Sequence, residues 1–144
     1  MNSGPPSTQL VTTPPPTRMD LIGRCFRKIL NGWGRASRRE YWSFFLLVLT
    51  FCVSAIAFEL NVLDDSDGGA SSVFIAAFVI AIVVLGPALF FVGMRRYHDI
   101  GRSGWLYAFH MFTGFGTLFA LFAMIAKSEP YDNKHGPVPP EARR

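Results

Sequence analysis

The feature that most constrains this chain is a stretch from Trp42 to Met94 that contains no lysine or arginine and carries its apolar residues in long continuous blocks. A helix needs about 20 apolar residues, at 1.5 Å each, to cross about 30 Å of hydrocarbon. Three segments meet this requirement, at residues 42–60, 73–94 and 105–126. The sequence therefore predicts three membrane-spanning helices.

The same blocks argue against a membrane β-barrel. Barrel strands alternate apolar and polar residues over about 10 positions, whereas residues 79–85 are apolar without interruption. Of all residues, 50% are hydrophobic and the mean hydropathy is positive, which is unusual for a soluble protein of 144 residues. The predicted fold class is an all-α membrane protein.

The polar regions divide the chain into segments. Residues 1–19 are rich in proline, serine and threonine and hold too little apolar surface to fold, so we expect a disordered N-terminal tail. The membrane domain is expected at residues 34–127, and residues 128–144 should form a polar C-terminal tail.

Residues 20–33 are predicted to form an amphipathic helix. Apolar residues recur in pairs every four positions, while Arg24, Arg27 and Lys28 occupy the other face. Asp20 is the expected N-cap. A basic face opposite apolar and aromatic residues is typical of helices that lie in the headgroup plane, although a helix packed on a soluble partner has the same pattern.

The first membrane helix is expected to start near Ser37. Ser37 and Glu40 match a capping box, in which each side chain satisfies a free backbone amide of the other residue. Residues 37–41 also resemble a twin-arginine export signal. A long leader and a full-length apolar block favour a retained helix instead.

The distribution of basic residues predicts the orientation. Of the 14 Lys and Arg, seven precede Trp42, none lies in the connection at 61–72, three lie in residues 95–104 and four in the tail. The positive-inside rule then places the N-terminus and residues 95–104 in the cytoplasm. Three spans would put the C-terminal tail outside, whereas one re-entrant segment would return it to the cytoplasm.

Two sequence strings are also recognisable, at residues 34–42 and 95–105. Together with the tail segment 133–137 they resemble the bacterial inner-membrane family of domain of unknown function 805, over about residues 21–139. Tyr97 departs from the leucine that is more frequent in that family. The resemblance implies a helical protein of the bacterial inner (plasma) membrane, and it supplies no reaction and no catalytic residues.

The two strings hold the candidate site residues. Guanidinium groups suit phosphate, so a cluster of arginines at the cytoplasmic ends of the spans is a candidate site for anionic lipid headgroups. Alternatively, these arginines set topology and form internal ion pairs with Asp99 or Glu40. The sequence leaves both interpretations open for Arg35, Arg38, Arg39, Arg95, Arg96, His98, Asp99 and Arg102.

Catalytic and metal sites are not expected. His98 beside Asp99 offers an acid or base, but no nucleophile accompanies them, and Ser103 is a plausible helix N-cap. The histidines are scattered and neither cysteine has a partner at zinc-ligand spacing. His110 lies within the third apolar segment, where it should reach the interface or bond a neighbouring helix. No cofactor is expected.

These observations favour a noncatalytic structural or accessory membrane protein. Membrane lipids are the expected partners, because the net charge of +4 flanks apolar segments and does not indicate nucleic acid. A homo-oligomer or a membrane protein partner is compatible with the sequence. The alternatives are a small transporter or channel component acting as an oligomer, and a lipid enzyme using His98 and Asp99.

Overall fold

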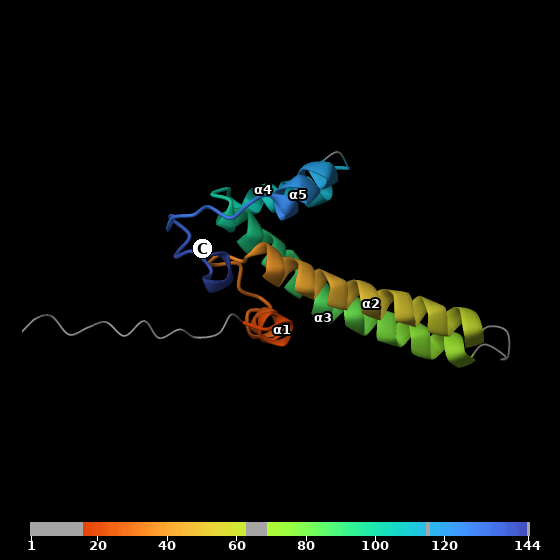
Figure 1. Cartoon of the computed structure of the whole chain (residues 1–144). Helices are drawn as coiled ribbons and strands as arrows, with labels where there is room; N and C mark the ends of the chain where they lie inside the picture. Colours follow the sequence, from red (N-terminus) through yellow and green to blue (C-terminus); the bar gives the residue numbers. More distant parts are fainter. Residues whose placement is uncertain (1–15, 63–68, 115, 144) are drawn as a thin grey trace, which may run out of the picture.

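A computed structural model describes residues 16–62, 69–114 and 116–143, and its regular elements are helical. The predicted disordered tail falls mostly outside these ranges, as do residues 63–68 of the acidic connection between the first two apolar segments. A short 3-10 helix near the C-terminus follows the α-helices (Figure 1). The helices are α1 (Arg18–Arg27), α2 (Arg38–Val62), α3 (Gly69–Asp99), α4 (Gly104–Phe112), α5 (Gly116–Ile125) and the 3-10 helix (Pro140–Ala142).

Helices α2 and α3 form a long antiparallel hairpin (Figure 1). Their segments Arg38–Asn61 and Ile75–Asp99 are long and apolar enough to cross a membrane. Only 11% and 17% of their most apolar stretches are buried, so they differ from the core helices of a soluble protein. Two of the three predicted spans are thus present as continuous helices.

The prediction of a third continuous span at 105–126 is wrong. The chain forms two helices there, α4 and α5, of 9 and 10 residues. Each is about 15 Å long, half of what a membrane crossing requires. Thr113 is extended at the C-cap of α4. A Cβ on Gly116 would lie 2.5 Å from His110 Cα, so the return of the chain depends on this glycine.

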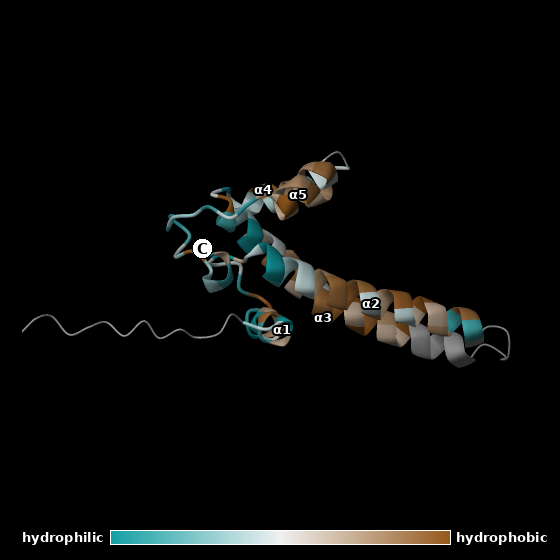
Figure 2. Cartoon of the chain, viewed as in Figure 1, coloured by the Kyte–Doolittle hydropathy of each residue, from teal (hydrophilic) through white to brown (hydrophobic). Residues whose placement is uncertain are grey.

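The two hairpins diverge from a common polar end. Helices α4 and α5 contact each other and leave the polar end in a different direction from α2 and α3 (Figure 1). Figure 2 shows that both hairpins are mainly hydrophobic along their length, whereas hydrophilic residues gather at the junction, in α1 and in the C-terminal segment. Among the described residues, most charged side chains therefore lie at one end.

Helix α1 is shorter than predicted and begins earlier. It starts at Arg18, because Thr17 is the N-cap and Asp20 completes the capping box from the third helical position. It ends at Arg27, with Lys28 as its C-cap, six residues before the predicted end at Trp33. Its apolar face is used within the chain, since Leu21 and Cys25 are buried.

The predicted capping box at the start of α2 is half formed. Ser37 Oγ accepts from the Glu40 backbone amide at 3.2 Å. The Glu40 side chain does not cap in return, and its carboxylate is turned to arginines of other elements. Ser37 therefore starts the helix, while Glu40 serves tertiary structure.

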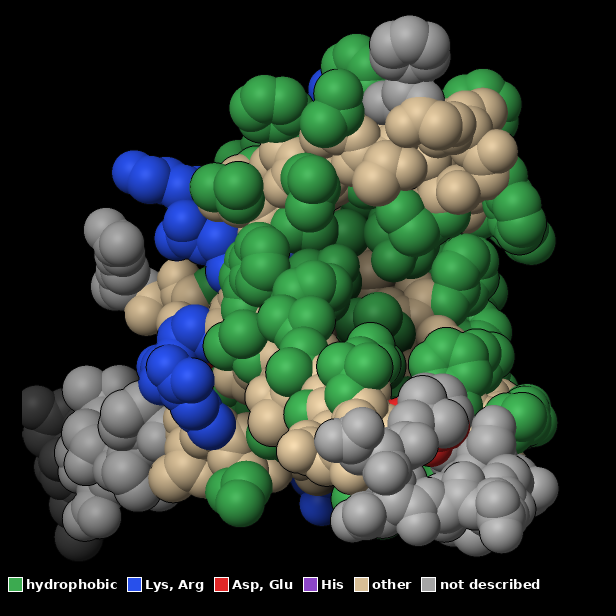
Figure 3. Space-filling model, turned by 90° about the vertical axis from the view of Figure 1, so that its right-hand side faces the viewer, with side chains coloured by type: hydrophobic (Ala, Val, Ile, Leu, Met, Phe, Trp, Pro, Cys, Tyr) green, Lys and Arg blue, Asp and Glu red, His purple; other side chains and the backbone are tan. Residues whose placement is uncertain are grey.

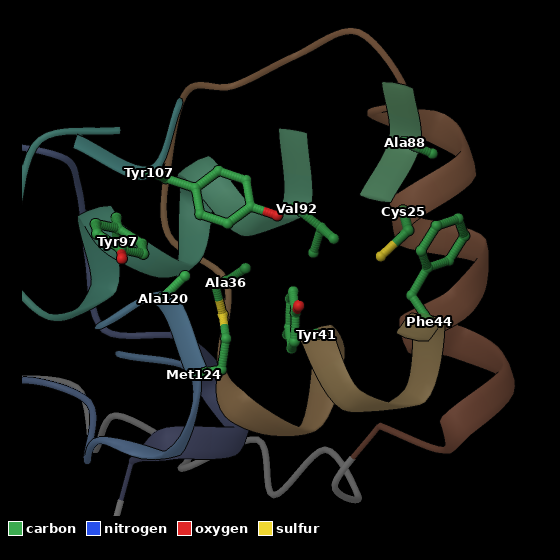
Figure 4. Close-up of a cluster of buried hydrophobic side chains, with 10 residues drawn as sticks. All are labelled: Cys25, Ala36, Tyr41, Phe44, Ala88, Val92, Tyr97, Tyr107, Ala120 and Met124. Carbon is green, nitrogen blue, oxygen red and sulfur yellow. The ribbon is translucent and has the colours of Figure 1, made fainter. Parts of the chain in front are cut away.

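The buried apolar core lies at the junction of the hairpins (Figure 4). Tyr107 of α4 packs so closely on α3 that a Cβ on Gly93 would lie 2.3 Å from its ring. Only glycine at this position allows the contact. The core side chains are Cys25, Ala36, Tyr41, Phe44, Ala88, Val92, Tyr97, Tyr107, Ala120 and Met124.

Candidate functional site

The two arginine-containing strings meet at the polar junction, where several charged side chains are buried. Glu40, Arg95, Arg96 and Asp99 are each 0% exposed. Burying a charge costs several kcal/mol unless it is paired and hydrogen-bonded. Their partners therefore decide what this end of the molecule can do.

Asp99 holds two arginines from different strings. Arg35 Nε lies 3.0 Å from Asp99 Oδ1, and Arg96 Nη1 donates to Asp99 Oδ2. All three side chains are at most 1% exposed. This ion cluster joins the segment before α2 to the C-terminal end of α3.

Arg35 also anchors the C-terminal segment. Its Nη1 donates to the Tyr131 carbonyl at 2.8 Å, and its Nη2 donates to the Glu129 carbonyl at 2.8 Å. Asn133 Nδ2 donates to the His98 carbonyl at 3.0 Å. The tail thus lies at the same end of the molecule as the segment before α2, which fits the re-entrant alternative for residues 105–126 better than a third full crossing.

Two further arginine contacts fasten the C-terminal end of α5. Arg96 Nη2 donates to the Ala126 carbonyl, and Arg38 Nη1 donates to the Ile125 carbonyl at 3.3 Å. The last carbonyls of a helix lack intrahelical donors, and cations near this end interact favourably with the helix dipole. These contacts bring α5 back to the junction and so explain the second hairpin.

Glu40 is the centre of a second cluster. Its Oε1 accepts from Arg95 Nη1 at 2.7 Å, and its Oε2 lies 3.5 Å from Arg24 Nη1. Arg24 Nη1 also lies 3.1 Å from Glu141 Oε1, which accepts from Ser37 Oγ. This cluster connects α1, α2, α3 and the C-terminal 3-10 helix.

The Cys25 thiol faces the same carboxylate, and its surroundings favour the protonated form. Sγ donates to Glu40 Oε1 at 3.7 Å. Burial and the neighbouring carboxylate raise the pKa of this thiol to about 12. A thiol that stays protonated at neutral pH reacts poorly.

His98 and Asp99 have different contact partners. Asp99 is occupied by arginines, whereas His98 Nδ1 lies 3.2 Å from the Gly34 carbonyl, and the His98 ring stacks on His135 at 3.9 Å. Burial, with Lys134 and Arg35 nearby, lowers the pKa of His135 below its usual value. The stack is another contact between the tail and α3.

His110 bonds a neighbouring helix, one of the two roles expected for it. Its Nδ1 lies 2.7 Å from the hydroxyl of Tyr97, which connects α4 to α3. In the part of the chain that the structure describes, no group of three or more His, Cys, Asp or Glu is placed to hold a metal ion. The polar contacts at this end therefore join elements of the chain to one another.

The remaining predicted arginines have a different environment. Arg39 and Arg102 are exposed, and neither side chain makes an ion pair or hydrogen bond to another described residue. Arg38 is partly exposed and has the single contact to α5. The predicted set of basic residues is thus divided into buried arginines with acidic partners and accessible ones without.

Several participants were not predicted from the sequence. The sequence indicates Glu40 only as one possible ion-pair partner, and it places Arg24 on the basic face of residues 20–33. The tail residues Glu129 and Glu141 lie about 90 residues or more from their arginine partners. The sequence does hold one signal for the role of Glu40, because a carboxylate beside a long apolar block needs a cationic partner.

Comparison with known proteins identifies the family and two relatives of this chain. The chain matches the family described as "Protein of unknown function (DUF805)" over residues 29–137. It is 30% identical to inner membrane protein YhaH of Escherichia coli K12 over 123 residues, covering 84% of this chain and 97% of that protein. The YhaH protein of Escherichia coli O157:H7 is equally similar. No solved structure shows a significant match. The chain, with two helices long enough to span the inner membrane, therefore belongs to the DUF805 family of proteins of unknown function.

Proposed function

We propose that this protein is a noncatalytic structural or accessory protein of the inner membrane, whose arginine-rich cytoplasmic end contacts anionic lipid headgroups. The observation that most directly supports a structural role is that Asp99 binds both Arg35 and Arg96 in a fully buried cluster. Groups used in this way connect elements of the fold and are not free to act on a substrate.

The proposed topology has two spans and both termini in the cytoplasm. Helices α2 and α3 cross the membrane, while α4 and α5 enter and return on the same side. The attachment of Arg35 to the carbonyls of Tyr131 and Glu129 supports this arrangement, as does the short length of α4 and α5. The excess of Lys and Arg before Trp42 supports a cytoplasmic N-terminus.

Helix α1 is proposed to lie at the membrane surface beside the start of α2. Phe26 of α1 packs edge-on against Phe44 at 5.5 Å between ring centroids, and Phe26 remains 42% exposed. Arg27 of the same helix is exposed. A helix that presents apolar and cationic groups together suits the headgroup layer.

Cysteine labelling of the full chain tests the topology. After replacement of Cys25 and Cys52 by Ala, single cysteines at Ser66 and Lys134 are treated in intact cells with a maleimide that does not cross the inner membrane. We expect labelling at position 66 and none at position 134 until the membrane is permeabilised. Labelling of position 134 in intact cells would overturn the two-span arrangement.

Lipid analysis tests the headgroup contact. The protein is extracted together with its surrounding lipid, and the composition is compared with that of the whole membrane. Enrichment of anionic phospholipids over phosphatidylethanolamine is expected, because each basic residue near an anionic surface contributes about 1 kcal/mol. A retained composition equal to that of the bulk membrane would contradict the proposal.

A further inference from the structure

We infer that a groove between the N-terminal ends of α1 and α2 is a binding site for one anionic phospholipid, with the phosphate at Arg18, Arg38 and Arg39 and an acyl chain along α2. This inference rests on the proposed contact with headgroups and assigns it to particular residues. The arginines of the two strings do not take part equally.

The groove combines cationic and apolar walls. It has a volume of about 450 Å³, and three arginines line it together with apolar side chains. Such a combination suits an amphiphile with a negative head better than a soluble anion, which needs no apolar wall. The lining residues include Arg18, Arg38, Arg39, Trp42, Leu46 and Ile125.

Two of the three arginines of the groove have no partner among the described residues, and Arg38 uses only Nη1, which donates to the Ile125 carbonyl. Arg18 and Arg39 are exposed, and neither forms an ion pair within the described ranges. Glu141 lines a different hollow that Arg38 and Arg39 also line, but its carboxylate is bound by Arg24 and Ser37. Guanidinium groups bind phosphate oxygens in bidentate geometry. The start of α2 also favours an anion through its helix dipole.

The groove continues into the apolar part of the molecule. A second hollow of about 650 Å³ shares Arg18 and Leu46 with the first and extends along α2 to Phe51. From Arg39 to Phe51 the helix rises about 18 Å at 1.5 Å per residue, which is a large part of one leaflet. Figure 3 shows Lys and Arg side chains gathered along one edge of a broad apolar face.

The depth of the groove fits a lipid in the cytoplasmic leaflet. Arg38 and Arg39 begin the candidate span, and Trp42 follows one turn later, at the level where indole rings prefer the interface. The phosphate would then lie at headgroup depth while the chain follows Leu46 and Phe51 inward. Arg35, in contrast, is only 7% exposed and lines none of these hollows.

Lipid titration of the full chain in detergent tests the site. Phosphatidylglycerol or phosphatidylethanolamine is added, and bound lipid is counted by native mass spectrometry. Relative to wild type, the variant Arg18→Gln/Arg38→Gln/Arg39→Gln should bind phosphatidylglycerol at least about tenfold more weakly, which corresponds to about 1.4 kcal/mol. Because Arg38 also contacts α5, the variant Arg18→Gln/Arg39→Gln is measured beside it and should lose affinity in the same direction.

A charge-matched control separates this site from general attraction. The variant Arg27→Gln/Arg102→Gln/Lys134→Gln removes three exposed cations that do not line the groove. Because these cations can meet headgroups without lining the groove, the control should weaken phosphatidylglycerol binding clearly less than the groove variant does. Equal weakening in both triple variants would overturn the assignment of the site.

One further variant and one competition experiment distinguish a lipid from a free anion. Leu46→Trp keeps all charges but obstructs the apolar continuation, so it should weaken phosphatidylglycerol binding. Inorganic phosphate in excess should not displace the lipid. Displacement by phosphate together with an unaffected Leu46→Trp variant would indicate a free-phosphate site and refute the inference.

The outcomes also separate the inference from the proposed function. If wild type prefers phosphatidylglycerol and the groove variants keep that preference, the inference fails while the general headgroup contact stands. If wild type binds both lipids equally, the headgroup contact fails as well.

Discussion

The arginines at the polar end of this protein have the same side chain but lie in two environments, which differ in burial and in the presence of acidic partners. Arg35, Arg95 and Arg96 are buried and paired with carboxylates. Arg39 and Arg102, from the same two sequence strings, are exposed without acidic partners in the described structure. The first group joins elements of the fold, whereas the second is accessible.

The comparison shows how differently a charge change should act in the two groups. Removing the partner of a buried charge leaves that charge uncompensated, whereas an exposed side chain exchanges one solvated state for another. The effect on stability should therefore be largest at the buried cluster and smallest at the exposed arginines.

Asp99→Asn should cause the largest loss of stability. The substitution removes the carboxylate shared by Arg35 and Arg96, both of which remain buried. We expect a loss of about 3–5 kcal/mol in the free energy of unfolding in detergent. Asp132→Asn is the control, because Asp132 is exposed and the amide oxygen can still accept from the Val138 amide. Equal stability of both variants would show that the buried carboxylate of Asp99 contributes no more to stability than the exposed one of Asp132.

The Arg95 and Glu40 pair should show strong coupling. Arg95→Met leaves Glu40 with Arg24 at 3.5 Å, and Glu40→Gln leaves Arg95 without its carboxylate. The double variant should lose about 1–3 kcal/mol less than the sum of the single variants in thermal or denaturant unfolding. Additive losses would show that the two side chains do not stabilise each other.

Docking of the C-terminal segment should weaken in acid. The docked tail holds the pKa of His135 below 6.5, its ordinary value, so the undocked tail binds a proton first as the pH falls. Docking should therefore be fully stable above about pH 6.5 and become weaker below it, until docked His135 is also protonated. Hydrogen exchange of residues 129–138, measured on both sides of pH 6.5, tests this.

A His135→Asn variant is the control for the acid effect. It cannot gain a proton in this range, so its exchange should change less between the two conditions than in wild type. An unchanged pH response in this variant would assign the effect to another group, such as His98, which stacks on His135.

Arg102→Ala should have the smallest effect. The side chain is exposed and has no partner among the described residues. Surface substitutions of this kind usually change stability by less than about 0.5 kcal/mol. A larger loss in thermal unfolding would mean that Arg102 belongs with the buried group, and the comparison would have to be redrawn.

The long apolar helices could be predicted because their signal is local. About 20 apolar residues in succession, without charges, leave few alternatives to a membrane helix. The third segment has the same composition, yet it breaks at Thr113 and Gly116, where the chain reverses against His110. Hydropathy indicates how long an apolar segment is, but the interruption between α4 and α5 depends on close backbone contacts that it does not reveal.

The sequence could predict which arginines gather at the candidate site, but not which of them are buried and which are accessible. Arg35 and Arg39 lie four residues apart, and the sequence indicates the same chemistry for both. Arg35 is buried because the tail carbonyls at residues 129 and 131 and the Asp99 carboxylate surround it. These partners lie 64 to 96 residues away, beyond the reach of any local pattern.

The sequence by itself determined the helical class, the two long spans and the basic character of one end, because hydropathy and charge are properties of short segments. Only the tertiary structure decided that the third apolar segment forms a hairpin and that the C-terminal segment packs against the segment before α2. It also decided which arginines are paired. Each of these depends on contacts between distant residues, and the high cost of burying an unpaired charge is what makes such contacts specific.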